Sequence, residues 1–255
     1  MANLSFIRKF KANFIRFGLH RFVPFKHGML NIIYLAKISK WHREQPKIKF
    51  NDFYSSGWDY NKRYKLYEYL FEDHNTGDKI NYLEFGVAVG KSLKWWVENN
   101  KNPETEFHGF DTFTGLPEDW GPFKAGAMST GNKPPEINDG RLTFYTGLFQ
   151  QTLPGFLERL KNDNSKRKVI HLDADLYSAT LYVLATIAPY LKKGDIIMFD
   201  EFAVPQSEFL AYMDFTRSFY IDLEMIAAAN NYFFVAFRVS KNCFKSNLDF
   251  VTLLG

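Results

Sequence analysis

Residues 82–92 have the sequence Tyr-Leu-Glu-Phe-Gly-Val-Ala-Val-Gly-Lys-Ser. This pattern predicts a buried strand, a tight turn at Gly86 and Gly90, and the first turn of a helix. Small Ala88 between the glycines leaves room for a ligand beside the backbone. The spacing is Gly-x-x-x-Gly after Glu84, which differs from the Gly-x-Gly-x-x-Gly fingerprint of dinucleotide-binding folds. The turn therefore predicts a ligand site and argues against NAD.

Further along the chain, short β-type runs alternate with helical patterns, as in βαβ units around a parallel sheet. Strands are predicted at Ile80–Phe85, Glu106–Asp111, Arg141–Thr146, Val169–Asp173, Asp195–Asp200, Glu224–Ala228 and Tyr232–Val239. Helices are predicted near Lys91–Asn100, Gln151–Lys161, Ser178–Leu191 and Glu208–Phe219. The predicted fold class is α/β, a doubly wound and mostly parallel seven-stranded sheet of the Rossmann-like type, with an N-terminal helical extension.

Three of the predicted strands end in a carboxylate: Asp111, Asp173 and Asp200. Ligands of open α/β sheets bind outside the carboxyl ends of the strands, so these acids mark a site. Capping of a following helix is the alternative for each acid, and it explains one acid better than three. Asp111 follows the strand after the glycine turn, where a carboxylate can accept both hydroxyls of a ribose. S-adenosylmethionine (SAM) has no pyrophosphate and carries positive charge, which suits a turn flanked by acids.

The connection between Asp111 and Gly140 is long and contains Gly, Pro, Trp120 and Phe123. Connections of this length in a compact domain are usually functional. We interpret it as a lid over the ligand edge, in which the two aromatic residues either cover an acceptor or anchor the loop.

Four segments together resemble class I SAM-dependent methyltransferases related to macrocin O-methyltransferase: Glu84–Gly90, Gly109–Trp120, His171–Tyr177 and Phe199–Phe202. The resemblance covers about residues 60–240. It implies methyl transfer from SAM to a hydroxyl of a small molecule or a sugar or glycan, assisted by Mg²⁺.

The same resemblance implies the roles of individual residues. The expected cofactor-binding residues are Glu84, Gly86, Ala88, Gly90, Ser92, Asp111, Thr112, Phe113, Gly147, Leu148 and Asp173. Arg63 and Tyr64 lie where related enzymes place cofactor-facing side chains. The expected metal ligands are Asp173, Asp200 and Glu201, and Glu201 departs from the Asp or Asn usual in related enzymes. Oxygen ligands of this kind suit Mg²⁺.

Asp173 is the first candidate for catalysis, as metal ligand and proton acceptor, and Asp175 and His171 are further candidates for the base. A buried, hydrogen-bonded core histidine is the alternative for His171. Three other functions stay open: a metal-independent methyltransferase of the same fold, an NAD-binding oxidoreductase, and a non-catalytic SAM-binding protein.

The chain divides into a basic helical extension, residues 1–58, and a methyltransferase domain, residues 59–255. Residues 1–49 contain eleven Lys and Arg against one acid, whereas the remainder has a net charge of −6. Phe residues recur at helical spacing in the extension, which is typical of peripheral membrane anchors. The alternative is a helix that docks on the catalytic domain or on a second subunit of a homo-oligomer. Nucleic acid is not expected as a partner, because Asp175-Leu-Tyr replaces the Pro-Pro-aromatic motif of base methyltransferases.

Composition sets further bounds. The single Cys243 excludes an internal disulfide and fits a reducing compartment. No apolar stretch approaches the ~20 residues that span a bilayer, and no signal peptide is evident. The expected location is the cytoplasm, with peripheral membrane contact through the extension as an option.

Overall fold

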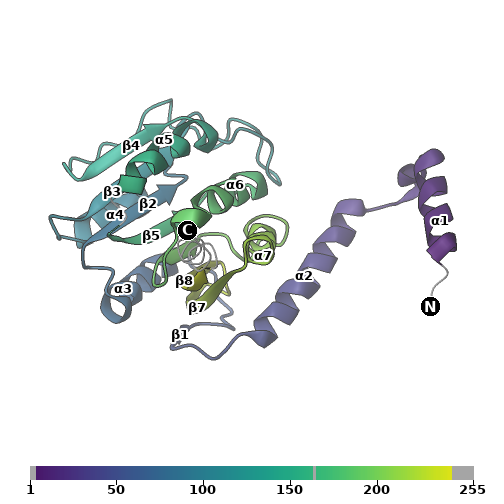
Figure 1. Ribbon diagram of the computed structural model, residues 1–255, viewed down its shortest axis with the longest axis horizontal. Coiled ribbons are helices and arrows are strands. Elements are labelled where there is room, and N and C mark those ends of the chain that lie inside the picture. Colours follow the sequence, from purple (N-terminus) through teal and green to yellow (C-terminus); the bar gives the residue numbers. More distant parts are fainter. Residues whose placement is uncertain (1–3, 163–164, 243–255) are drawn as a thin grey trace, which may run out of the picture.

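The computed structural model describes residues 4–162 and 165–242; Cys243 lies outside them. Within these ranges the chain forms one eight-stranded sheet in the order β1-β7-β8-β6-β5-β2-β3-β4 (Figure 1). The strands are β1 (Phe50–Asn51), β2 (Ile80–Phe85), β3 (Glu106–Asp111), β4 (Leu142–Thr146), β5 (Arg167–Leu172), β6 (Ile196–Phe199), β7 (Ile221–Ala229) and β8 (Phe234–Asn242). Only β8 runs antiparallel to its neighbours, so the carboxyl ends of the other strands share one edge.

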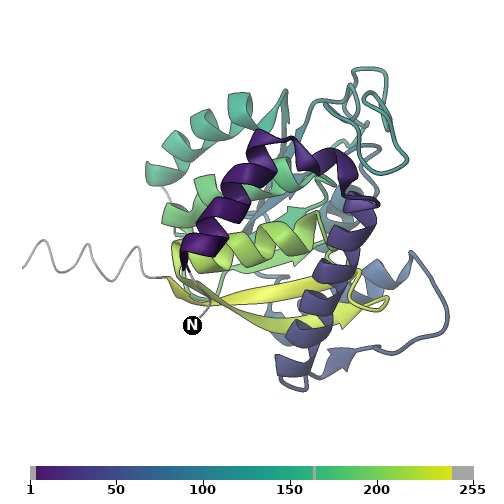
Figure 2. The same cartoon turned by 90° about the vertical axis from the view of Figure 1, so that its right-hand side faces the viewer.

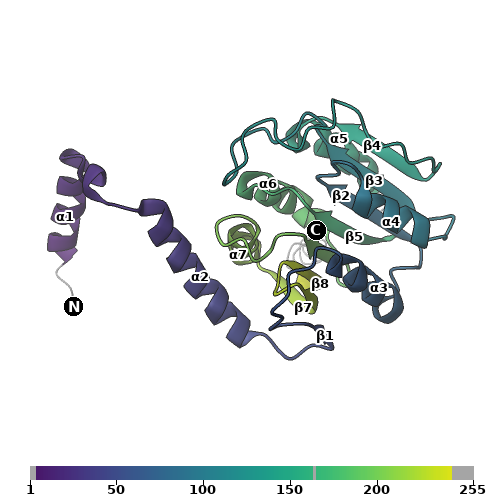
Figure 3. The same ribbon diagram turned by 180° about the vertical axis from the view of Figure 1, so that it is seen from behind.

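Helices cover both faces of this sheet (Figures 1 and 3). The helices are α1 (Leu4–Arg16), α2 (Lys26–Glu44), α3 (Lys62–His74), α4 (Lys91–Asn99), α5 (Phe149–Asn162), α6 (Tyr177–Ile187) and α7 (Glu208–Phe219), with short 3-10 turns at Leu19–Phe22 and Ala188–Tyr190. Buried residues of α3 and α4 pack on one face, and those of α5, α6 and α7 pack on the other. The layering is that of a doubly wound fold.

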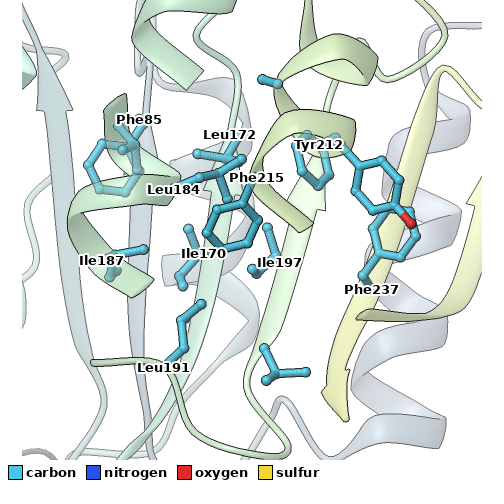
Figure 4. Close-up of a cluster of buried hydrophobic side chains, with 14 of the residues drawn as sticks. Phe85, Ile170, Leu172, Leu184, Ile187, Leu191, Ile197, Tyr212, Phe215 and Phe237 are labelled. Carbon is cyan, nitrogen blue, oxygen red and sulfur yellow. The ribbon is translucent and has the colours of Figure 1, made fainter. Parts of the chain in front are cut away.

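The central strands β2, β5 and β6 are buried over almost their whole length because both faces of the sheet are covered. All six residues of β2 and all four of β6 are buried. Figure 4 shows how Ile170 and Leu172 of β5 meet Leu184 and Ile187 of α6, with Phe215 of α7 beside them. This packing holds the strand ends, and therefore the functional residues that follow them, in a rigid frame.

The predicted fold class is confirmed, with two differences in detail. The sheet has eight strands rather than seven, because β1 pairs in parallel with Ala227 and Ala228 of β7. A two-residue strand is too short to produce a periodic pattern in the sequence. Helix α3 was also not predicted, although Leu66 and Leu70 at i, i+4 spacing are both buried and give the expected signal.

The N-terminal segment forms an arm rather than part of the layered domain. Figures 1 and 3 show α2 leaving the side of the domain and α1 standing apart from it. Trp41 near the end of α2 is the anchor: it is buried, and its ring packs among Phe202, Phe209, Tyr212, Tyr232 and Phe237. No helix of the described ranges is long and apolar enough to cross a membrane.

Candidate active site

The acids predicted at the strand ends converge at the carboxyl edge of the sheet. Asp111 ends β3, while Asp173 and Asp200 directly follow β5 and β6. A cavity of about 440 Å³ opens there. It is lined by Tyr60, Gly86, Ala88, Asp111, Thr112, Gly115, Leu116, Pro117, Glu118, Met128, Leu148, Phe149, Gln150, Asp173, Ala174, Asp175, Leu176, Ser178, Ala179 and Glu201.

The glycine turn brings two backbones into contact. Gly86 has φ +93°, and a Cβ at this position would lie 1.8 Å from the carbonyl oxygen of Asp173. Gly90 has φ +74°, and a Cβ there would lie 2.6 Å from Cγ of Pro135 in the long loop. Gly86 therefore reaches the cavity, whereas Gly90 is covered by the loop that packs on the turn.

Asp111 joins the turn to the start of the long loop. Its Oδ2 accepts the backbone N–H of Ala88 and its Oδ1 that of Phe113, both at 2.7 Å. A carboxylate has about four acceptor positions, so both oxygens can still accept further hydrogen bonds. The sequence predicts this residue to hold a ribose, and its place in the cavity wall is compatible with that role.

A charged network lies buried beneath the cavity. Nη2 of Arg63 lies 2.7 Å from Oδ2 of Asp200, and Nη1 donates to Oγ of Ser92 at 2.9 Å. His171 lies between two acids, with Nε2 3.4 Å from Oδ1 of Asp200 and Nδ1 3.4 Å from Oε2 of Glu84. Buried charges of opposite sign compensate one another here, as burial requires.

His171 is a buried member of this network, and the prediction that it is a base is not supported. Burial alone would lower its pKa, but hydrogen bonds to Asp200 and Glu84 raise the pKa of His171 to about 10. The imidazole is therefore protonated near neutral pH and has no lone pair with which to take a proton. It also does not line the cavity.

Asp175 and Glu201 form a second acidic pair, and this pair does line the cavity. Their carboxyl groups are hydrogen-bonded to each other. Burial, followed by the charges of Asp200 and Asp111, raises the pKa of Asp175 to about 7. Burial and the neighbouring Asp175 raise the pKa of Glu201 to about 8. A pair with such pKa values holds a proton near neutral pH and can exchange it with a ligand.

The expected Mg²⁺ ligands fit a divalent cation poorly. One atom each of His171, Asp173 and Asp200 lie within 4.8 Å of one another, and Glu201 is not part of this group. The guanidinium of Arg63 already contacts both carboxylates, 2.7 Å from Asp200 and 3.9 Å from Oδ2 of Asp173. The positive charge of Arg63 takes the place that a bridging cation would need.

The other predicted cofactor residues fall into two groups. Ala88, Thr112, Leu148 and Asp173 line the cavity as expected. The structure does not bring the following ones to its wall: Glu84, Gly90, Ser92, Phe113 and Gly147. Several of these have another role that the geometry explains: Glu84 accepts a hydrogen bond from Tyr82, Ser92 binds Arg63 and Tyr67, and Phe113 is buried against Phe144.

The long loop contributes to the cavity, but not through the aromatic residues singled out in the sequence. Leu116 and Met128 line the wall. Trp120 and Phe123 instead stack on each other, with ring centroids 5.4 Å apart and planes 14° from parallel. The anchoring interpretation of these two residues is the one that their contact favours.

Among the cavity residues that sequence reasoning missed, Tyr60 and Glu118 make hydrogen bonds that explain their positions. Tyr60 precedes α3 and donates a hydrogen bond to Oδ2 of Asp200 at 3.2 Å. Glu118 accepts a hydrogen bond from Ser178 at 2.9 Å, which ties the long loop to α6. Neither has a local pattern that marks it, because each acquires its role from a partner far away in the sequence.

Comparison with known proteins agrees with this geometry. Residues 83–202 match a protein family described as a methyltransferase domain. Among solved structures, CalS11, a calicheamicin methyltransferase, is 19% identical, with a TM-score of 0.53 over 81% of this chain and 91% of that one. The O-methyltransferase NovP is 14% identical, with a TM-score of 0.54 over 84% and 99%. No curated protein matches the chain. At these identities the structural neighbours show the fold, a Rossmann-like methyltransferase fold.

Proposed function

We propose that this chain is a SAM-dependent methyltransferase that methylates a hydroxyl oxygen of a small molecule or of a sugar or glycan. The observation that carries the proposal is the position of Asp111. Two backbone N–H groups hold its carboxylate in the wall of the cavity, between the glycine turn and the long loop. The match of residues 83–202 to a methyltransferase domain supports the same cofactor.

The reaction is a displacement at the methyl carbon. The acceptor oxygen forms the new bond to carbon while the bond from carbon to the sulfonium sulfur breaks, which leaves neutral S-adenosylhomocysteine and releases the hydroxyl proton. Alignment of the two reactants supplies most of the acceleration in such a step. The frame formed by β2, β3 and β5 provides the rigidity that alignment needs.

Asp175 is the proton acceptor in this proposal. It lines the cavity, and its pKa of about 7 is suited to taking a proton near neutral pH. Glu201 shares a hydrogen bond with it and can spread the accepted proton over the pair. Asp173 is less suited as the proton acceptor, because its carboxyl group lies 3.9 Å from the guanidinium of Arg63. In addition, burial and the charge of Asp200 raise the pKa of Asp173 well above its ordinary value.

The metal-independent form of this activity is the one that the geometry favours. The expectation of Mg²⁺ is a prediction from resemblance, and the Arg63 guanidinium already pairs with Asp200 at 2.7 Å and lies 3.9 Å from Asp173. The role assigned to Asp175 requires no metal.

Calorimetric titration with SAM and with S-adenosylhomocysteine tests the proposal. We expect micromolar binding of both compounds, lost at least tenfold in Asp111→Ala. The matched control is Asp119→Ala, which removes an exposed acid from the same loop. Absence of heat with either compound would overturn the proposal and make NAD the next ligand to titrate. Binding without transfer of labelled methyl to any of a panel of hydroxyl compounds would favour a non-catalytic SAM-binding protein.

A further inference from the structure

The N-terminal arm, residues 4–43, has an unusual composition for a segment in contact with an acidic domain. Residues 1–43 contain nine Lys and Arg and no Asp or Glu. Lys40 lies 3.7 Å from Glu44, the last residue of α2, and the eight other cations have no acid within residues 1–43. The arm is therefore strongly basic.

Helix α1 has an aromatic stripe that is bordered by basic side chains. At ~100° per residue, Phe6, Phe10 and Phe14 fall within about a quarter of the helix circumference. The side chains of Phe6 and Phe10 are 70% and 57% exposed. Arg8, Lys9 and Lys11 occupy the remaining circumference on both sides of this stripe. An exposed aromatic stripe with basic borders is the pattern of helices that lie in a membrane interface.

The exposed apolar surface continues beyond α1 through the turn and into α2. Its large side chains are all more than one-third exposed, and they are Phe17, Phe22, Phe25, Met29, Leu30, Ile32, Ile33 and Leu35. Together with the stripe on α1 these exposed side chains make the arm rich in apolar groups that are not buried in the described residues. A surface of this extent marks an interaction site.

The arm leaves the domain at the edge that carries the cavity. Asn31 in α2 is hydrogen-bonded to Gln206 in the loop after β6, and Trp41 packs against Phe202 in the same loop. Asp200 and Glu201 of the site begin this loop. Figure 2, in which the arm points toward the viewer, shows α1 in front of the α5–α7 layer, and Figures 1 and 3 show that it stands clear of that layer.

Charge favours a lipid surface over a second copy as the partner of the arm. Two arms packed together would bring two sets of nine cations into one interface, and buried interface cores are depleted of charge. The catalytic domain is acidic overall, but three of its exposed large apolar residues, Tyr60, Met128 and Leu148, line the cavity. Val89, Phe123 and Tyr220 are exposed outside the cavity wall. An anionic membrane surface matches both properties of the arm, because it attracts Lys and Arg and accepts Phe at the same depth.

We propose that the arm binds the surface of anionic membranes, with α1 in the interface, and that it holds the cavity edge of the domain toward the bilayer. The acceptor would then be one that is presented near a membrane. Trp41 connects the arm to the domain, because its ring packs against Phe202, Tyr212 and Phe237 in the aromatic core.

Co-sedimentation of the full chain with vesicles tests the proposal. We expect binding to vesicles of phosphatidylcholine mixed with phosphatidylglycerol, and little binding to phosphatidylcholine alone. Each cation near an anionic surface contributes roughly fivefold to binding. The triple variant Arg8→Gln, Lys9→Gln, Lys11→Gln should therefore lose about a hundredfold, and Phe6→Ser with Phe10→Ser should lose binding as well.

The matched control is Lys101→Gln, Lys133→Gln, Lys193→Gln, which removes three exposed lysines from the domain and should leave vesicle binding unchanged. SAM titration of each variant shows that the domain is intact, independently of the arm. Failure of the full chain to sediment with anionic vesicles would overturn the proposal, as would equal binding of the arm variants. Light scattering that shows a dimer without lipid, lost in the Phe6 and Phe10 variant, would assign the arm to a second copy instead.

Discussion

Arg63 and Asp200 are 137 positions apart in the sequence, and in the structure Nη2 of the guanidinium lies 2.7 Å from Oδ2 of the carboxylate. Both side chains are almost completely buried, 5% and 1% exposed. The pair joins α3 to the end of β6. It therefore connects the first helix of the layered domain to the centre of the site.

Removal of this cation should destabilise the protein. Arg63→Met leaves the carboxylate of Asp200 buried without its strongest partner, and breaking a buried pair costs about 3–5 kcal/mol. Denaturant unfolding measures the change. Arg238→Met is the control, because its pair with Glu224 is exposed and should contribute less than about 1 kcal/mol. Equal losses in the two variants would contradict the assigned role of Arg63.

Divalent metal should not be needed for cofactor binding. We expect SAM affinity in the presence of excess EDTA to equal that with Mg²⁺, within about twofold, and Mg²⁺ alone to leave the unfolding midpoint of the wild-type chain unchanged. Arg63→Met should respond differently, because its carboxylates lack a cation and Mg²⁺ can restore one. Stabilisation of the wild-type chain by Mg²⁺ would show that the metal displaces Arg63.

Stability should fall as the pH rises through the acidic range. The pKa values of Asp175 and Glu201, about 7 and about 8, are above their ordinary values in an unfolded chain. From about pH 4.5 to about pH 8 the folded state therefore holds more protons than the unfolded state, and the free energy of unfolding decreases as the pH rises. Protonated His171 decreases the free energy of unfolding further as the pH rises above about 6.5, because its pKa is higher in the folded state than in the unfolded state.

The variant Asp175→Asn isolates this effect. Asn tolerates the left-handed backbone of this position, φ +57°. It should reduce the pH slope of the unfolding free energy by up to about 1.4 kcal/mol per pH unit, as one proton contributes. Methyl transfer should fall about 10²–10⁴-fold if the carboxylate is the base. An unchanged slope would show that Asp175 titrates normally.

Trp41, which anchors the arm to the domain, should contribute strongly to the free energy of unfolding. Trp41→Ala removes a buried indole from five surrounding rings, and such a truncation costs about 3–5 kcal/mol. Thermal or denaturant unfolding measures it. The control Trp58→Ala truncates an indole that belongs to a residue 60% exposed and should cost far less. A small loss at Trp41 would mean that α2 is not docked in solution.

The strand ends were predictable because they depend on local sequence. Apolar runs end in acids at Asp111, Asp173 and Asp200, and parallel strands bring such ends to one edge. β2 and β3 have the predicted bounds, and α7 is confirmed as Glu208–Phe219. The hydrophobic pattern of the sequence was sufficient to predict these elements, because their packing in the layered domain requires the same pattern.

The roles of charged residues were less predictable, because they depend on partners that are distant in the sequence. Arg63 was expected to face the cofactor, yet it faces Asp200. Glu201 was expected to bind metal, yet it pairs with Asp175. No local sequence pattern indicates either contact. The identity of Asp111 as a cavity residue was predictable, but its two backbone donors were not.

Gly86 has a consequence for how this sequence can change over evolutionary time. A side chain there would collide with the backbone of Asp173, so the chain could not keep its present path just beyond the ends of β2 and β5. Selection for the sheet alone is enough to retain the glycine. A descendant that had lost methyl transfer while keeping its architecture would still retain Gly86, whereas Asp175 and Glu201 would be free to drift. If Asp175 acts as proposed, the fate of the acidic pair, rather than of the glycine, distinguishes a working enzyme from an inherited scaffold.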